Sequence, residues 1–190
     1  PFFNRSFSIS QAIMKADLLG VLHAGISKKI DEKLTIGGRF KIYSSSLNVE
    51  TNNNSGSITT TTNTINISRL TLQNLDAGVN TSGIDNIEED VLSNTFLGGN
   101  LGIGFDVGLT YHFSPQIEFT GSILDLGFIK HSKNTRNFTA KGNYVLDGIN
   151  FEYNPNDPID YWEQLTNDFD ARIPSEETED AYTSWRPMKL

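Results

Sequence analysis

The side chains of this chain that could do chemistry are carboxylates, amides and a few histidines, and their spacing decides what chemistry is open to them. Four carboxylates lie close together near the C-terminal end, where a pair could act as the acid and base of glycoside hydrolysis. Adjacent acids are more typical of a solvated run of charge. Catalysis is therefore not predicted for Glu176, Glu177, Glu179 and Asp180.

A second set of oxygen ligands lies in the segment "NPNDPID". Ca²⁺ takes six to eight oxygen ligands, and the spacing of these residues departs from that of an EF-hand loop. A solvated turn followed by a helix cap is the favoured interpretation of Asn154, Asn156, Asp157 and Asp160.

The three histidines, His23, His112 and His131, are far apart and lack the spacing of a metal site. The chain has no cysteine, which removes disulfides, thiolate ligands and Cys nucleophiles. No nucleophile elbow, phosphate-binding loop or dinucleotide-binding glycine pattern is present. We therefore expect no enzymatic activity, no cofactor and no catalytic, cofactor-binding or metal-ligating residue.

Two isolated aspartates are of more interest. Asp106 falls on the face of a strand opposite its apolar side chains, where a lumen or solvent would suit it. Asp125 lies within "SILDLGF", where the alternation of the strand changes phase. A buried carboxylate needs a partner, and we expect Asp125 to be a strand-end or bulge acid bonded to backbone rather than a ligand site.

The elements that would position these residues begin with a strand at 101–113. Apolar residues occupy alternate positions, which predicts a strand with one apolar face. The apolar face holds Leu101, Ile103, Phe105, Val107, Leu109, Tyr111 and Phe113, and the other holds Gly102, Gly104, Asp106 and Gly108.

A turn at Ser114-Pro115-Gln116 leads to a return strand with Ile117, Phe119 and Ile123. The shift of phase at Leu124 indicates a bulge or the end of the one-sided environment.

A second hairpin is predicted around a tight turn at Asp31-Glu32-Lys33. In its second strand the apolar positions and the polar positions again alternate. Leu34, Ile36, Gly38, Phe40 and Ile42 are expected on one face, and Thr35, Arg39 and Lys41 on the other.

A third strand pair is expected around residues 49–75, because the Thr-rich run suits a pleated sheet. The alternative is a disordered Ser/Thr/Asn linker, against which Ile65, Ile67, Leu70 and Leu72 weigh. Residues 52–57 are predicted to be a polar loop. Connections near residues 30 and 113 are short, whereas those around 50–58, 75–98 and 130–180 are long and polar. Short turns at one end and long loops at the other are typical of outer-membrane barrels.

One helix is predicted within an acidic excursion at 147–180, which carries eleven acidic residues and one basic residue. Asp157 is expected to be the N-cap, with Pro158 in the first helical position. Apolar residues then recur at steps of three and four up to Pro174. Trp162, Leu165 and Phe169 on this stripe are predicted to contact a partner.

Net charge limits the partners. A net charge of −8 argues against nucleic acid, which needs clustered Lys and Arg. No apolar run is long enough for a membrane-spanning helix, whereas barrel strands alternate and leave the mean hydropathy low.

The run "FLGGNLGIGFDVGLTYHFSPQIEFTGSILDLGFIKHSKNTRNF", together with "GGRFKIYSS", "NNNSG" and "EETEDAYTSWRPMKL", resembles a Bacteroidota family of outer-membrane β-barrel proteins of unknown function. Members are similar to barrels of the long-chain fatty-acid-transporter type and longer than this chain. The resemblance implies that the chain is a fragment, with a signal peptide upstream and further strands on both sides. It implies no enzymatic residue.

These observations predict an all-β fold, with residues 1–190 forming part of a single antiparallel transmembrane β-barrel in the bacterial outer membrane. About five or six strands are seen, below the eight or more of a single-chain barrel. The expected function is a porin-like channel or carrier for small or hydrophobic solutes, with outer-membrane lipid around residues 101–113. Two alternatives stay open: a non-transporting barrel that docks with other outer-membrane proteins in a secretion or uptake complex, and a soluble β-sandwich binding module.

Overall fold

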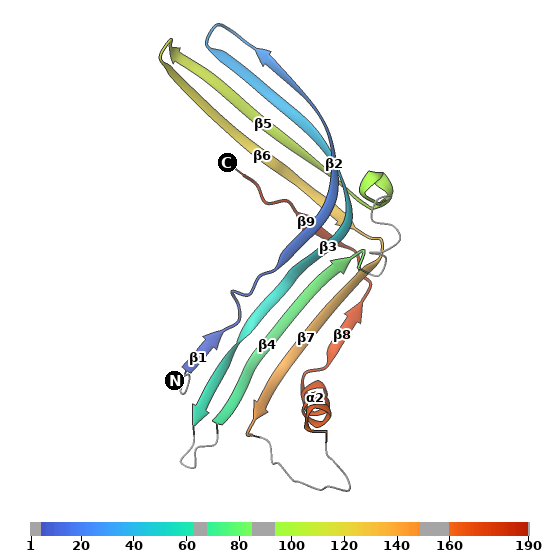
Figure 1. Cartoon of the computed structure of the whole chain (residues 1–190). Helices are drawn as coiled ribbons and strands as arrows, with labels where there is room; N and C mark the ends of the chain where they lie inside the picture. Colours follow the sequence, from blue (N-terminus) through green and yellow to red (C-terminus); the bar gives the residue numbers. More distant parts are fainter. Residues whose placement is uncertain (1–4, 63–67, 85–93, 149–159, 190) are drawn as a thin grey trace. The chain divides into compact units, whose positions relative to one another are not determined.

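The part of the chain that the structure describes folds mainly into antiparallel β-structure and contains one α-helix (Figure 1). The structure is a computed structural model that describes residues 5–62, 68–84, 94–148 and 160–189. Among these residues, no helix is long and apolar enough to cross a membrane. The elements are β1 (Arg5–Ser8), β2 (Lys15–Lys29), β3 (Leu34–Thr62), β4 (Ser68–Ser82), an irregular turn η1 (Asn94–Gly98), β5 (Asn100–Ser114), β6 (Ile117–His131), β7 (Thr135–Leu146), α2 (Tyr161–Arg172), β8 (Ser175–Thr178) and β9 (Tyr182–Trp185).

Hydrogen bonds join these strands in the order β8-β7-β4-β3-β5-β6-β9, and β1 and β2 also pair with β3. Among the described residues this path ends at β8 and β9 and is not closed. The predicted antiparallel all-β fold with a short helix is therefore confirmed, and closure into a barrel stays a prediction.

The chain divides into two compact units, which are described separately below. Unit 1 comprises Pro1–Lys15, Glu50–Asn80 and Arg136–Thr178. Unit 2 comprises Ala16–Val49, Thr81–Thr135 and Glu179–Leu190.

Unit 2 contains both predicted hairpins. The turn between β2 and β3 is held by a side chain within it. The backbone amides of Lys33 and Leu34 donate hydrogen bonds to Asp31 Oδ1 at 2.7 and 2.8 Å. These two hydrogen bonds lower the pKa of the Asp31 carboxyl. In the other hairpin, β5 ends at Ser114 and β6 begins at Ile117, as the Ser-Pro-Gln turn predicts.

The predicted bulge lies in β6. Phe105 pairs with Leu126 but Val107 pairs with Ile123, so two residues of β6, Leu124 and Asp125, oppose Asp106. Asp125 adopts a φ of 60°, in the left-handed region that aspartate tolerates better than most residues. The extra residue explains the change of phase, and β6 continues beyond it to His131. The alternative interpretation, an end to the one-sided environment at Leu124, is wrong.

The predicted polar loop at 52–57 is also wrong, because these residues belong to β3. Residues 57–60 of β3 pair with β1, which supplies backbone partners that their side-chain types do not reveal. Gly56 has a φ of 133°, a conformation suited to glycine. Likewise, residues 75–82 belong to β4, and β7, α2 and β8 occupy much of the stretch predicted as a long connection at 130–180.

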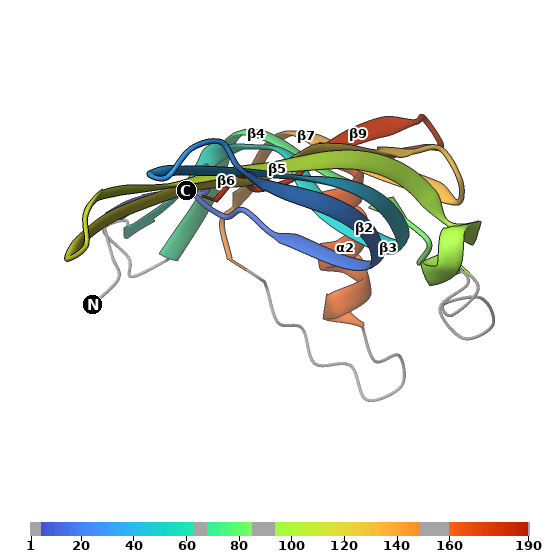
Figure 2. The same ribbon diagram turned by 90° about the horizontal axis from the view of Figure 1, so that it is seen from above.

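In unit 1, α2 lies to one side of the strand layer that contains β4 and β7 (Figure 2). The N-cap is Asp160, whose Oδ1 accepts from the amides of Trp162 and Glu163 at 3.0 and 3.1 Å. The prediction of Asp157 as the cap is therefore wrong for this helix, since α2 begins at Tyr161. Asp157 and Pro158 themselves lie outside the described residues.

Candidate functional site

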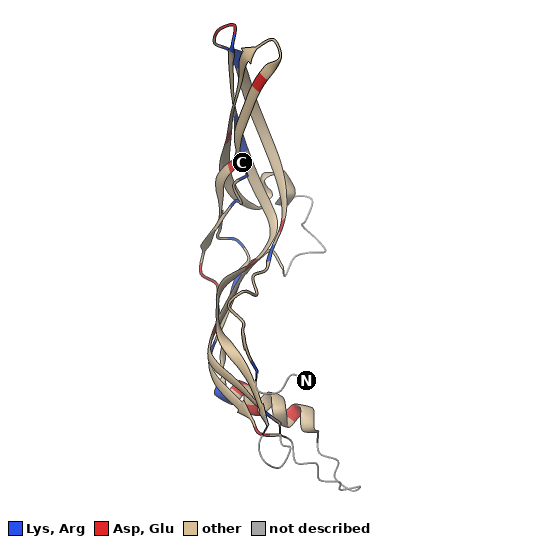
Figure 3. Cartoon of the chain, turned by 90° about the vertical axis from the view of Figure 1, so that its left-hand side faces the viewer, with Lys and Arg blue, Asp and Glu red and all other residues tan. Residues whose placement is uncertain are grey.

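One face of the unit 2 sheet is apolar and exposed. The seven alternating residues of β5 all lie on it, and six of them are exposed. The pairing aligns five of them with apolar residues and glycines of β3 and β6, such as Phe40 opposite Phe105, while Leu101 lies opposite Ser44. No charged side chain occupies these aligned positions, and the sparse charge along the strands can be followed in Figure 3. The aligned residues are Leu34, Ile36, Gly38, Phe40 and Ile42 of β3, and Phe119, Gly121, Ile123, Leu126 and Phe128 of β6.

The bulge keeps this face continuous. Before it, odd-numbered residues of β6 pair with the apolar residues of β5, and after it even-numbered ones do. Phe128 therefore joins the face and contacts Trp185 of β9, with ring centroids 5.6 Å apart. The alternation that the sequence predicts is confirmed, whereas contact of this face with lipid stays a prediction.

The opposite face of unit 2 is polar. Gly102, Gly104 and Asp106 are buried there and Gly108 is half-buried. Nearby, a hollow of about 440 Å³ lies over β2, β3, β5 and β6. Its lining includes several glycines and five hydroxyl side chains, those of Ser27, Thr35, Thr110, Thr120 and Ser122. Whether this face lines a lumen stays a prediction.

A cluster of charges lies beside the bulge on the polar face. Lys41 Nζ lies 2.7 Å from Asp106 Oδ1 and 2.6 Å from Asp125 Oδ1. The Asp125 amide donates to Asp106 Oδ1 at 2.8 Å, and Arg39 Nε lies 3.3 Å from Asp106 Oδ2. Lys41 and Asp106 are buried, so the cluster is a desolvated network in which each carboxylate has a cation.

Tyr43 completes this cluster. Its hydroxyl donates to Asp125 Oδ1 at 3.2 Å, and Arg186 lies over its ring at 5.7 Å. The ring packs directly against Gly104, where any Cβ would collide with it. Glycine is thus required at 104 by this close approach, which anchors Tyr43 across the sheet.

Asp106 and Asp125, which the sequence singles out separately, therefore meet in one site. The expectation that the Asp125 carboxylate bonds to backbone is wrong, because its carboxylate accepts from Lys41 and Tyr43. It is the Asp125 amide that donates, to the carboxylate of Asp106.

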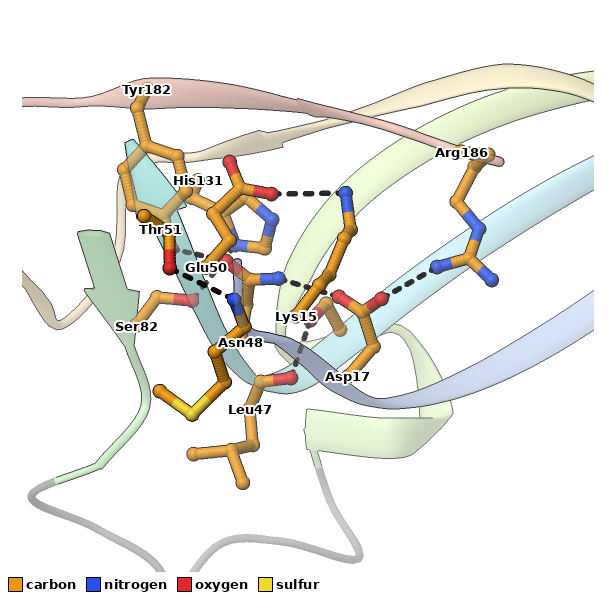
Figure 4. A network of polar contacts seen from close by, with 12 residues as sticks. Lys15, Asp17, Leu47, Asn48, Glu50, Thr51, Ser82, His131, Tyr182 and Arg186 are labelled. Atoms are coloured by element: carbon orange, nitrogen blue, oxygen red, sulfur yellow. Dashed lines mark hydrogen bonds and ion pairs between the residues drawn. The ribbon is translucent and has the colours of Figure 1, made fainter. Parts of the chain in front are cut away.

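A second polar network joins β9 to the rest of unit 2 (Figure 4). Tyr182 donates its hydroxyl proton to Asn48 Oδ1 at 2.6 Å, and Asn48 donates to Asp17 Oδ1 at 2.5 Å. Arg186 holds the other oxygen of Asp17 at 2.8 Å. The ring of Tyr182 stacks on the fully buried His131, with centroids 4.6 Å apart.

These contacts show what the histidines do. His131 Nδ1 lies 2.8 Å from Ser82 Oγ, and His112 Nδ1 lies 3.2 Å from Glu118 Oε2. Ser82 and His131 are both fully buried, so no substrate can reach this pair. No group of three or more metal-ligating His, Asp or Glu side chains occurs in the described part of the chain.

The acidic and amide residues that the sequence offered as candidate catalytic or calcium-binding groups are the last to place. Glu177 pairs with Arg136 at 2.5 Å, and Glu176, Glu179 and Asp180 are exposed. Asp160 caps α2, while Asn154, Asn156 and Asp157 lie outside the described residues.

The predicted partner-contact helix packs on its own unit. Phe169 contacts Tyr144 of β7 edge to face, with centroids 5.2 Å apart. Leu165 is half-buried and Trp162 is 77% exposed. Contact of these residues with another protein stays a prediction.

Comparison with known proteins bears on the whole chain. The model of a family described as "Family of unknown function (DUF5723)" matches residues 1–190. The chain belongs to this family. No curated protein and no solved structure gave a significant match. The predicted membership of a family of unknown function is thus confirmed, while its source and barrel type stay predictions.

In this DUF5723 chain, the site residues that sequence reasoning missed are Lys41 and Tyr43 of the ion cluster, and Asn48 and Tyr182 of the second network. Lys41 had a usable signal, since the alternation already placed it on the face opposite the apolar residues. Tyr182 had none, because its partner lies 134 residues away in the sequence.

Proposed function

We propose that the chain is part of an antiparallel transmembrane β-barrel of the bacterial outer membrane, in a Bacteroidota family, and that it forms a channel or carrier for small or hydrophobic solutes. In this proposal β2, β3, β5 and β6 cross the bilayer, and the apolar face of unit 2 meets lipid.

The observation that carries the proposal is the uncharged, exposed face that runs across β3, β5 and β6. A sheet whose one face meets water usually places its apolar residues on the buried face and polar residues on the exposed one. Here the arrangement is reversed, with Phe105 exposed and Asp106 buried. Outer-membrane strands show this reversed order, apolar side out and polar side in.

The spacing of aromatic residues supports the same conclusion. Tyr111, Phe113 and Phe119 lie near the Ser-Pro-Gln turn, and Phe128 and Trp185 lie near the pair formed with Ile103. From Ile103 to Phe113 the strand rises about 34 Å, at ~3.4 Å per residue. At a tilt of ~40° this corresponds to about 26 Å along the membrane normal, close to the ~25 Å apolar band between the aromatic girdles of such barrels.

The polar face suits passage of a solute. The glycines and hydroxyl groups around the hollow leave space and offer hydrogen bonds without a fixed net charge. The neighbouring ion cluster is internally neutralised, because two cations face two carboxylates.

The docking alternative has less support. It rests on the expectation that the apolar residues of α2 must pack against another protein, and Phe169 already packs on Tyr144 of the same unit, although Trp162 stays exposed. A soluble β-sandwich would have to cover the exposed apolar face with a second sheet.

Two charge substitutions on β5, three residues apart, test the membrane assignment. Val107→Arg places a charge on the apolar face, at an expected cost of about 2–4 kcal/mol near the bilayer midplane. Thr110→Arg, the matched control, places the same charge on the opposite, polar face of β5, where Thr110 pairs with Thr35 and Thr120, and should insert normally. The readout is the fraction of folded protein recovered in outer membranes or in lipid vesicles.

A soluble protein would reverse the expectation, since Val107→Arg would then add charge to a water-exposed surface and improve recovery. Equal insertion of both variants, or recovery of the wild-type protein without detergent, would refute the membrane assignment. Transport is tested separately by single-channel recording on the reconstituted protein, where Thr110→Arg should reduce cation conductance.

A further inference from the structure

Unit 1 contains an apolar cavity that has no part in the proposed channel. The cavity has a volume of about 320 Å³ and lies between α2 and the strands β3, β4 and β7. Leu70, Leu72 and Tyr144 line it from the strands. Trp162, Leu165 and Phe169 line it from the helix.

The C-terminal half of α2 is held close to the strands. Phe169 contacts Tyr144, and the fully buried Ile173 packs beside Gly142. A Cβ at Gly142 would lie 2.7 Å from the carbonyl oxygen of Arg172, so glycine allows this close approach. The helix therefore has a firm contact at one end.

The first turns of α2 are different. Trp162, in the first turn, is 77% exposed although it lines the cavity, and Leu165 is only half-buried. Among the described residues, the strands leave the space beneath these two side chains open. An occupant in this space would cover the indole ring and the leucine together.

The lining limits what can bind. Among the described residues, no Lys, Arg, Asp or Glu side chain lines the cavity, and its side-chain polar groups are the hydroxyls of Tyr144 and Thr166 and the indole N–H of Trp162. Burial, and then the neighbouring Asp168 carboxylate, raise the pKa of Tyr144, so its phenol is neutral near pH 7. An ordered water molecule needs two to four polar partners, and an apolar cavity does not offer them. The volume is at the lower end of the ~300–1,000 Å³ range of small-molecule sites.

We propose that unit 1 binds one uncharged, hydrophobic small molecule between α2 and the strands, with Trp162 and Leu165 closing over it. This inference stands independently of the membrane assignment, because it depends only on contacts within unit 1.

The two tryptophans of the chain allow a direct test. Trp185→Phe leaves Trp162 as the one tryptophan, at the cavity, and Trp162→Phe leaves Trp185, on the apolar face of unit 2. The full-length chain, in lipid nanodiscs or in buffer if it is soluble, is titrated with the uncharged quencher 1-bromodecane. We expect quenching of Trp162 to saturate at one molecule per chain, and quenching of Trp185 to rise without saturation.

A cavity-filling variant provides the second arm. Leu165→Phe, made in the Trp185→Phe background, should weaken the saturable quenching at least tenfold by occupying the space. Asn167→Phe adds the same ring to an exposed position of α2 and should leave the quenching unchanged. Far-UV circular dichroism checks that both variants keep their fold.

Unsaturable quenching of Trp162, or equal quenching in the Leu165→Phe and Asn167→Phe variants, would overturn the proposal. A failure here leaves the Val107→Arg experiment unaffected, so the two proposals can fail separately.

Discussion

Removal of the cation at the centre of the ion cluster is the sharpest test of the site. Lys41 Nζ lies 2.7 Å from Asp106 and 2.6 Å from Asp125, and only 11% of its side chain is exposed. Lys41→Met keeps most of the apolar stem but leaves two carboxylates side by side. Breaking a buried ion pair costs about 3–5 kcal/mol, and we expect the lower value here because Arg39 still lies near Asp106.

The assay is urea unfolding followed by tryptophan fluorescence, with the protein in the same detergent or lipid throughout. The double variant Lys41→Met/Asp125→Asn removes one carboxylate as well and should recover at least half of the lost free energy of unfolding. The deficit of the single variant should shrink as the pH falls toward about 4, because protonation of a carboxylate removes the repulsion between the two. A loss under about 1 kcal/mol, too small for a broken buried pair, or a double variant no more stable than the single one, would refute a buried network at this site.

Three further substitutions follow from the local contacts. Gly104→Ala should cost about 1–3 kcal/mol by displacing the Tyr43 ring, whereas Gly108→Ala, where a Cβ meets only ordinary contacts, should be near neutral in the same unfolding assay. Asp160→Ala should destabilise α2 by about 1 kcal/mol and speed hydrogen exchange of its first-turn amides. The Asp31 carboxyl, whose pKa the turn lowers, should titrate below its ordinary value by NMR. Its turn should keep its hydrogen bonds above the ordinary pKa and lose them as the pH falls through the lowered one; titration at the ordinary value would show that the turn does not form.

The parts of the fold that sequence predicts well are those with a local signal. The period of two along 101–113 follows from the pleat of a single strand, and the turns at 31–33 and 114–116 follow from residues that lie within them. The bulge is also local, because an extra residue must shift the alternation. Each of these features can be derived without knowing which strands pair.

Features that depend on distant partners were predicted poorly. Asn52 to Ser57 have low strand propensity, and the stretch is a strand because β3 pairs with its neighbours β4 and β1, which are distant in the sequence. The start of α2 depends on whether Asp157 or Asp160 caps it, and both fit the local rule.

The ion cluster likewise has a part that the sequence predicts and a part that depends on strand pairing. The sequence placed Lys41 and Asp106 on the polar faces of their strands, and singled out Asp125. Their meeting depends on register: Arg39 pairs with Asp106, Lys41 pairs with Gly104, and the bulge turns Asp125 toward both. No local pattern specifies that register.

The bulge at Asp125 also determines which changes of length β6 can accept. Deleting one residue at 124–125 would restore a regular ladder and keep the order of faces, because Leu126 and Phe128 would still pair with Phe105 and Ile103 on the apolar side. A single-residue deletion or insertion anywhere else in β6 would reverse the faces of every residue between it and the next bulge or turn. Natural relatives that lack one residue of β6 should therefore lack it at this bulge.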